Sequence, residues 1–127
     1  MAKLLIDTNV LIDALRNTPA ATAYFQRISA EDLSCSSITV AELWAGVRPH
    51  EETGMENFLL NFQTVVIDNA IARQAGEYMR QFAKSHHLTL PDALIAAAAH
   101  VHRLELITRN TKHFPMKDVH VVAPYQH

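Results

Sequence analysis

Short β-rich runs alternate with helical stretches along the whole chain, and this alternation restricts the possible folds more than any other feature. Apolar residues between the runs recur at the spacing of amphipathic helices. The runs predicted as strands are residues 3–7, 33–37, 64–68, 104–108 and 119–123. Strands separated by helices require the crossover connections that parallel pairs use. We therefore expect an α/β fold, a three-layer α/β/α sandwich with a central, mainly parallel five-stranded sheet.

The composition is typical of one globular domain, which we expect to span residues 1–127. A chain of 127 residues that is 49% hydrophobic can bury a core without staples. Its single cysteine, Cys35, excludes a disulfide within the chain and favours a reducing, cytoplasmic setting. Asp7 and Asn9 interrupt the N-terminal apolar run, so neither an export signal nor a membrane span is expected. A net charge of −2 argues against a uniformly basic surface but allows a local basic patch.

Three acidic residues far apart in the sequence are predicted to meet at one edge of the sheet. Asp7 ends the first predicted strand, and Glu42 is expected in the first turn of the helix that follows the second. Asp92 lies in the first turn of a helix joined to the fourth strand by a very short connection. The carboxyl ends of parallel strands share an edge, and ligands gather there. The three carboxylates should therefore converge.

Each acid also has a purely structural interpretation. The pairs Thr39–Glu42 and Thr89–Asp92 match the capping-box pattern, and Asp7 could cap a helix. Taken singly, capping is the better explanation. Taken together, Glu42 and Asp92 both share helix faces with small or apolar residues, where carboxylates need a further reason. Carboxylates brought close repel one another unless a cation lies between them, and a hard divalent ion such as Mg²⁺ or Mn²⁺ suits oxygen ligands.

Three segments of the chain resemble a known family. They are "LLIDTNVLIDAL", "SSITVAELWAGV" and "LTLPDALIAAAAHVHRLELITRNTKHF". In this order, over nearly the whole chain, they look like the motifs of PIN domains, specifically of VapC-type toxin ribonucleases. The resemblance implies a metal-dependent endoribonuclease that uses Mg²⁺ or Mn²⁺ at Asp7, Glu42 and Asp92. It also implies supporting roles for Thr8 and Asn9 beside the first acid.

The same resemblance implies two protein partners besides the RNA substrate. One is a cognate antitoxin that covers the active groove, and the other is a second copy of the chain. Residues 51–84 carry more apolar helical surface than one small core requires, which favours a homodimer and an antitoxin-binding surface on these helices.

The chain departs from the family pattern after the fourth strand. Many members place a fourth acid there, whereas this sequence has the neutral Asn110 and, further on, His113. Asn110 is counted with the catalytic residues because its amide oxygen can bind water or a metal ion, and His113 is expected to contact phosphate or metal. With three acids rather than four, we expect one firmly held ion.

RNA also requires positive contacts, because neutralising phosphates supplies most sequence-independent affinity. Arg109 and Lys112 follow the fourth strand at the predicted active edge and are the expected phosphate contacts. Arg16 and Arg48 are assigned instead to helix C-termini, where a cation complements the dipole. Asp13 is expected on a helix surface.

Three other functions stay open. A receiver-like phosphoacceptor module should have an acid pair after the first strand and a late lysine, and a haloacid-dehalogenase-type phosphatase should have a second aspartate where Asn9 stands. A catalytically weak PIN domain could act only as a protein- or RNA-binding module. The missing fourth acid is the feature that favours this last alternative.

Overall fold

A computed structural model describes residues 2–126 of the chain. Its strands are β1 (Leu4–Ile6), β2 (Leu33–Ser36), β3 (Gln63–Val65), β4 (Glu105–Ile107) and β5 (Val121–Val122). Its α-helices are α1 (Thr8–Leu15), α2 (Pro19–Gln26), α3 (Ser37–Ala45), α4 (Glu52–Leu59), α5 (Asn69–His86) and α6 (Leu90–His102). Three short 3₁₀ turns are η1 (Ala30–Asp32), η2 (Pro49–Glu51) and η3 (Thr111–His113).

The five strands form one sheet in the order β3-β2-β1-β4-β5, and every neighbouring pair is parallel. Each predicted strand is present, and the predicted three-layer α/β/α architecture is confirmed. The sheet is wholly rather than mainly parallel, because a helix lies in every connection except the last, where η3 and a loop cross over. The central strand is β1, so the residue that follows it, Asp7, lies between the ends of β2 and β4.

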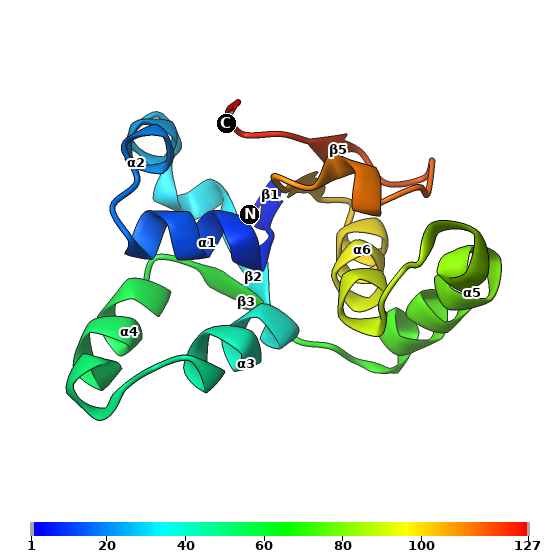
Figure 1. Ribbon diagram of the computed structural model, residues 1–127, viewed down its shortest axis with the longest axis horizontal. Helices are drawn as coiled ribbons and strands as arrows, with labels where there is room; N and C mark the ends of the chain where they lie inside the picture. The colour runs from blue at the N-terminus through cyan, green and yellow to red at the C-terminus, as the bar shows by residue number, and fades with distance from the viewer. Residues whose placement is uncertain (1, 127) are drawn as a thin grey trace.

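The helices form two layers, with α1 to α4 on one side of the sheet and α5 and α6 on the other (Figure 1). Successive side chains of each strand point to opposite faces of the sheet, so both helical layers pack against apolar strand residues. Leu5 and Leu106 face α5 and α6, whereas Ile6 and Ile107 pack with α1 to α4. All four side chains are essentially inaccessible to solvent. Strands buried on both faces read as continuous apolar runs, as the central strand β1 (LLI) does.

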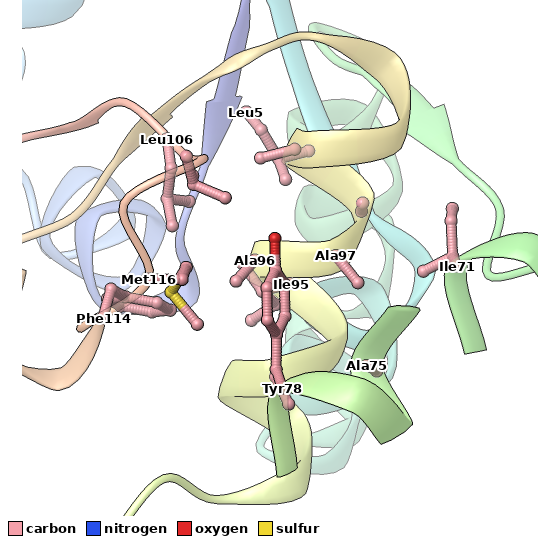
Figure 2. Close-up of a cluster of buried hydrophobic side chains, with 14 of the residues drawn as sticks. Leu5, Ile71, Ala75, Tyr78, Ile95, Ala96, Ala97, Leu106, Phe114 and Met116 are labelled. Atoms are coloured by element: carbon pink, nitrogen blue, oxygen red, sulfur yellow. The ribbon is translucent and has the colours of Figure 1, made fainter. Parts of the chain in front are cut away.

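Helix α6 is buried along most of its length because its middle is made of alanines. Figure 2 shows Ala96 and Ala97 between the sheet residues Leu5 and Leu106 and the α5 side chains Ile71 and Tyr78. Small side chains let α6 approach both the sheet and α5 closely. The helix ends at a left-handed residue, Arg103, with φ 56°, and β4 begins two residues later. This tight connection fixes α6, and therefore its first turn at the opposite end, against the sheet.

Cys35 lies in β2 and is fully buried, as predicted. Within residues 2–126, no helix combines the length and the apolar character that a membrane-crossing segment needs.

Candidate active site

Asp7 lies at the centre of the carboxyl edge of the sheet and is almost completely buried, with 5% of its surface exposed. Its backbone N–H donates to the carbonyl of Ile107 at 2.8 Å, which continues the β1–β4 pairing. Its side chain caps α1, because Oδ1 accepts the N–H of Thr8 at 2.8 Å. Oδ2 accepts the hydroxyl of Thr108 at 2.7 Å. Capping and placement at the site are therefore compatible roles of one carboxylate.

Glu42 reaches the same edge from α3, although not from the predicted position. Ser36, rather than Thr39, caps α3, because its hydroxyl accepts the N–H of Thr39 at 3.2 Å. The predicted capping box is therefore wrong, and Glu42 lies in the second turn of α3 instead of the first. The Glu42 carboxylate is nevertheless held at the edge, because the hydroxyl of Thr8 donates to Oε1 at 2.7 Å.

Asp92 lies in the first turn of α6, as predicted. Thr89 caps this helix, with its hydroxyl accepting the N–H of Asp92 at 3.3 Å. The Asp92 carboxylate faces His113, whose Nδ1 lies 3.8 Å from Oδ2. The chain therefore brings His113, at the position where a fourth acid was sought, next to the third acid.

The three carboxylates interact electrostatically. Burial raises the pKa of Asp7 above its usual value; hydrogen bonds from Thr108 and Thr8 oppose this, while the charges of Asp92 and Glu42 raise the pKa further. Burial also raises the pKa of Asp92, against the hydrogen bond with Thr89 and the charge of His113, and Glu42 adds to the rise. These mutual effects on the pKa values are consistent with the expectation that Asp7, Glu42 and Asp92 lie near one another at this edge.

The donor set suits a hard divalent cation. Each oxygen of Asp7 accepts one of the hydrogen bonds described above and keeps a lone pair for a further ligand. The mutual repulsion of the carboxylates is what a cation would relieve. Across residues 2–126, however, no three His, Cys, Asp or Glu side chains already form a metal-binding cluster.

Thr108, which the sequence reasoning did not select, holds Asp7 in a fixed orientation. It is fully buried directly after β4. Its oxygen receives the amide N–H of Asn9 at 3.4 Å and the backbone N–H of Asn110 at 3.1 Å. Both of these groups can only donate, so both lone pairs of the hydroxyl are used and its one hydrogen must point to Asp7. The feature of the sequence that could have identified Thr108 is its hydroxyl directly after the strand residues "LELI".

A second set of hydroxyls orients Glu42. A carboxylate only accepts, so Thr8 gives its one hydrogen to Glu42. The hydroxyl of Thr39, 2.9 Å from that of Thr8, must then donate to Thr8, and Ser36 donates to Thr39 at 3.4 Å. Ser36 and Thr39 are fully buried, and sequence reasoning missed them both as site residues. The result is a directed chain of hydroxyls from the end of β2 to the Glu42 carboxylate.

Asp13 differs from its predicted role, and Arg109 pairs with it. Asp13 was expected on a helix surface but is 8% exposed, and it accepts from Arg109 Nη1 at 3.0 Å and from the Tyr125 hydroxyl at 2.6 Å. The backbone N–H of Arg109 donates to Oδ1 of Asn9 at 3.3 Å, one helical turn before Asp13. We call Asp13, Arg109 and Tyr125 the α1 clasp. Through the α1 clasp, the guanidinium of Arg109, which was predicted to contact phosphate, also forms an ion pair within the protein.

The remaining predicted residues lie on the exposed side of this edge. Asn110 follows Thr108 and Arg109, and no side-chain hydrogen bond of Asn110 is formed within the described part of the chain. Lys112 and His113 lie on η3 and are exposed. Of the two, His113 faces Asp92, with Nδ1 3.8 Å from Oδ2.

Comparison with known proteins shows extensive similarity. The sequence of residues 4–119 matches the PIN domain family. Ribonuclease VapC10 of Mycobacterium tuberculosis is 38% identical over 115 residues, which cover 89% of this chain and 86% of that protein. Toxin FitB of Neisseria gonorrhoeae is 32% identical, covering 96% and 98%. A solved toxin-antitoxin complex from Klebsiella pneumoniae contains a chain with a TM-score of 0.84 and 35% identity, covering 98% and 100%.

Proposed function

This chain belongs to the PIN domain family, and we propose that it is a metal-dependent endoribonuclease, the toxin of a toxin-antitoxin pair. The observation that carries the proposal is the meeting of Asp7, Glu42 and Asp92 at the carboxyl edge of the sheet, with two buried hydroxyl arrangements that orient Asp7 and Glu42. A relative named as a ribonuclease, 38% identical over most of the chain, supports RNA as the substrate.

The proposed cofactor is Mg²⁺ or Mn²⁺. When bound, such an ion activates a water nucleophile and offsets the charge that develops on the phosphorus centre. Asp7 and Asp92 hold it, directly or through water, and Glu42 is either a further ligand or the group that orients the attacking water. Thr108 donates a hydrogen bond to Asp7, and Thr8 donates one to Glu42. These hydrogen bonds fix the orientation of both carboxylates relative to the ion. Asn9 supports Thr108.

The neutral residues at the fourth position also have proposed roles. Asn110 presents its amide to water or to the ion, and it counts among the catalytic residues. His113, already 3.8 Å from Asp92, and Lys112 beside it contact the phosphate that is cut. With one acid fewer than many relatives, the site holds one ion firmly.

The proposed partners are an antitoxin and a second copy of the chain, in the cytoplasm. The structural relative from Klebsiella pneumoniae is described as a toxin-antitoxin complex, and FitB is named a toxin. These names support an antitoxin for this chain. The apolar residues Leu60 and Val66 are exposed and lie within residues 51–84, which supports self-association through this segment.

The test is cleavage of a mixed pool of structured RNAs by purified, partner-free protein, with Mg²⁺, with Mn²⁺ and with a chelator. Asp7→Asn and Asp92→Asn are compared with the wild type, and Glu56→Gln, an exposed acid on α4, is the charge-matched control. We expect metal-dependent cutting that survives in the control and is lost in both aspartate variants. Cutting that persists in both variants, or no cutting by the wild type, would favour a PIN domain that only binds RNA or protein.

A further inference from the structure

We propose that the hollow between α1, α3 and α4 binds the RNA strand next to the cut, with Arg16 and Arg48 contacting its phosphates. The inference rests on the proposed function, and it names a substrate-binding surface that the acidic edge alone does not define. We call this hollow the α1–α3 groove. It has a volume of about 750 Å³, and its lining includes two arginines, Arg16 and Arg48, two acids, Glu42 and Glu51, and the apolar residues Leu43 and Val47.

Glu42 belongs to both the acidic edge and the α1–α3 groove, so the two are continuous. The Glu42 carboxylate accepts from Thr8 at the start of α1. From this point α1 runs away from the edge to its C-cap, Arg16. A helix rises about 1.5 Å per residue, so Arg16 lies about 12 Å from Thr8 along the axis. Single-stranded stacked nucleotides rise about 3.4 Å each, which places Arg16 about three to four nucleotides from the cut.

The two arginines are available for a ligand. No ion pair within residues 2–126 involves Arg16 or Arg48, whereas the guanidinium of Arg109 is bound to Asp13. The helix-dipole interpretation fails for Arg48, because α3 ends at Ala45 with Gly46 as its C-cap, and Arg48 is the N-cap of η2. Arg16 and Arg48 are therefore candidates for phosphate contacts in addition to Lys112.

Positively charged lining residues distinguish the α1–α3 groove from a second hollow of the described chain. That second hollow, of about 340 Å³, is lined by Phe25, Phe58 and Phe62 and contains no arginine or lysine. An apolar lining suits a protein segment. The α1–α3 groove instead has apolar side chains, Leu43 and Val47, and two guanidinium groups beside the carboxylates of Glu42 and Glu51. Guanidinium groups can bind phosphates while sugars and bases cover the apolar side chains. A phosphate chain beside three carboxylates requires such cations.

The test measures binding apart from cleavage. An unstructured 12-nucleotide RNA with a fluorescent 5′ label is titrated with full-length protein in a chelator, between 50 and 300 mM salt, where no cutting occurs. Arg16→Gln, Arg48→Gln and the double variant are compared with Arg80→Gln, which removes the same charge from an exposed position on α5, across the sheet. Thermal melting confirms that each variant is folded.

Each groove variant should reduce the slope of log K against log[salt] by about 0.7, and the double variant by about 1.4. At 0.1 M salt this corresponds to an affinity loss of about 5-fold for each single variant. Arg80→Gln should retain the wild-type slope. Wild-type slopes in both groove variants, or equal losses in Arg80→Gln, would overturn the proposal, and so would a wild-type protein that does not bind this RNA.

The proposed nuclease activity is checked separately by adding Mg²⁺ to the same samples. If the wild type cuts RNA but the groove variants keep wild-type binding, the groove proposal fails and the nuclease proposal stands. If the groove variants bind weakly and the wild type does not cut, only the nuclease proposal fails. A groove that instead accepts a protein partner gives unchanged RNA slopes, which again contradicts the RNA assignment.

Discussion

At the scale of single residues, the acidic edge depends on hydroxyl groups whose hydrogen positions are dictated by their neighbours. Thr108 has one hydrogen and two lone pairs, and all three are used. Asp7 is therefore fixed in orientation before any ion binds, although burial disfavours its charged form. An orienting residue that does not itself touch the ion should affect metal affinity as well as turnover.

Replacing Thr108 with valine should lower both metal affinity and RNA cleavage by about 10- to 100-fold, the usual effect of losing such a supporting hydrogen bond. Valine keeps the shape but leaves Oδ2 of Asp7 and the N–H of Asn110 without this partner. The unfolding free energy should fall by about 1–3 kcal/mol. Calorimetric Mn²⁺ titration without RNA measures the metal affinity. Thr108→Ser retains the hydroxyl and should keep most of the metal affinity. Equal losses in the serine and valine variants would indicate a packing defect instead.

Burial raises the pKa of the Cys35 thiol to about 11, from an ordinary value of 9.0. Because the folded state holds the proton more tightly than the unfolded state does, the protonated Cys35 thiol contributes to stability. This contribution is complete below pH 9 and is lost as the pH rises towards 11, because the unfolded state ionises first. At pH 8 about one thiol in a thousand is ionised. We expect negligible alkylation by iodoacetamide at pH 8 in native buffer and complete alkylation in urea, followed by mass spectrometry. Native labelling at the unfolded rate would contradict this.

At the scale of secondary-structure elements, the sequence predicted what periodicity and local chemistry determine. All five strands, the cap at Thr89 and the position of Asp92 follow from patterns within a few residues. The start of α3 was misplaced, because "SSIT" offers several possible caps and tertiary contacts select Ser36. Asp13 was misassigned for a different reason: its partners Arg109 and Tyr125 are 96 and 112 residues away, beyond any local pattern.

The α1 clasp should matter for stability because it joins α1, the end of β4 and the C-terminal segment. Asp13→Asn leaves a guanidinium that is 31% exposed without its charged partner, so we expect a loss of about 2–3 kcal/mol, less than for a fully buried pair. Tyr125→Phe removes one hydrogen bond to a charged group and should cost about 1.5–3 kcal/mol. Urea denaturation measures both. Tyr24→Phe is the control, because no hydrogen bond from the Tyr24 hydroxyl is formed within residues 2–126; a similar loss there would argue against the clasp.

At the scale of the whole molecule, two helical layers leave some apolar side chains outside either core. Leu60, 83% exposed, is the C-cap of α4, and Val66, 66% exposed, follows β3. Both lie in residues 51–84, where the sequence predicted excess apolar surface. A second copy of the chain would remove them from water without any change of fold.

We expect the purified protein to have twice the chain mass of 14.2 kDa by light scattering. Leu60→Lys and Val66→Lys should shift it towards the monomer, because a lysine is costly to bury at an interface. Val101→Lys, on α6 outside this segment, should leave the mass unchanged. A monomeric wild type would exclude the dimer. Dimers that tolerate both lysines and are weakened only by Val101→Lys would place the interface elsewhere.

The pairing of β1 with β4 sets when, during synthesis, this chain can become active. Asp7 leaves the ribosome early, but its orienting partner Thr108 is added 101 residues later. At translation rates of 5–20 residues per second this interval lasts about 5–20 s. Throughout it, a nascent chain carries the first acid without the strand that fixes it. A protein that damages RNA would thus remain harmless to the message and the ribosome that are making it until its central sheet can close.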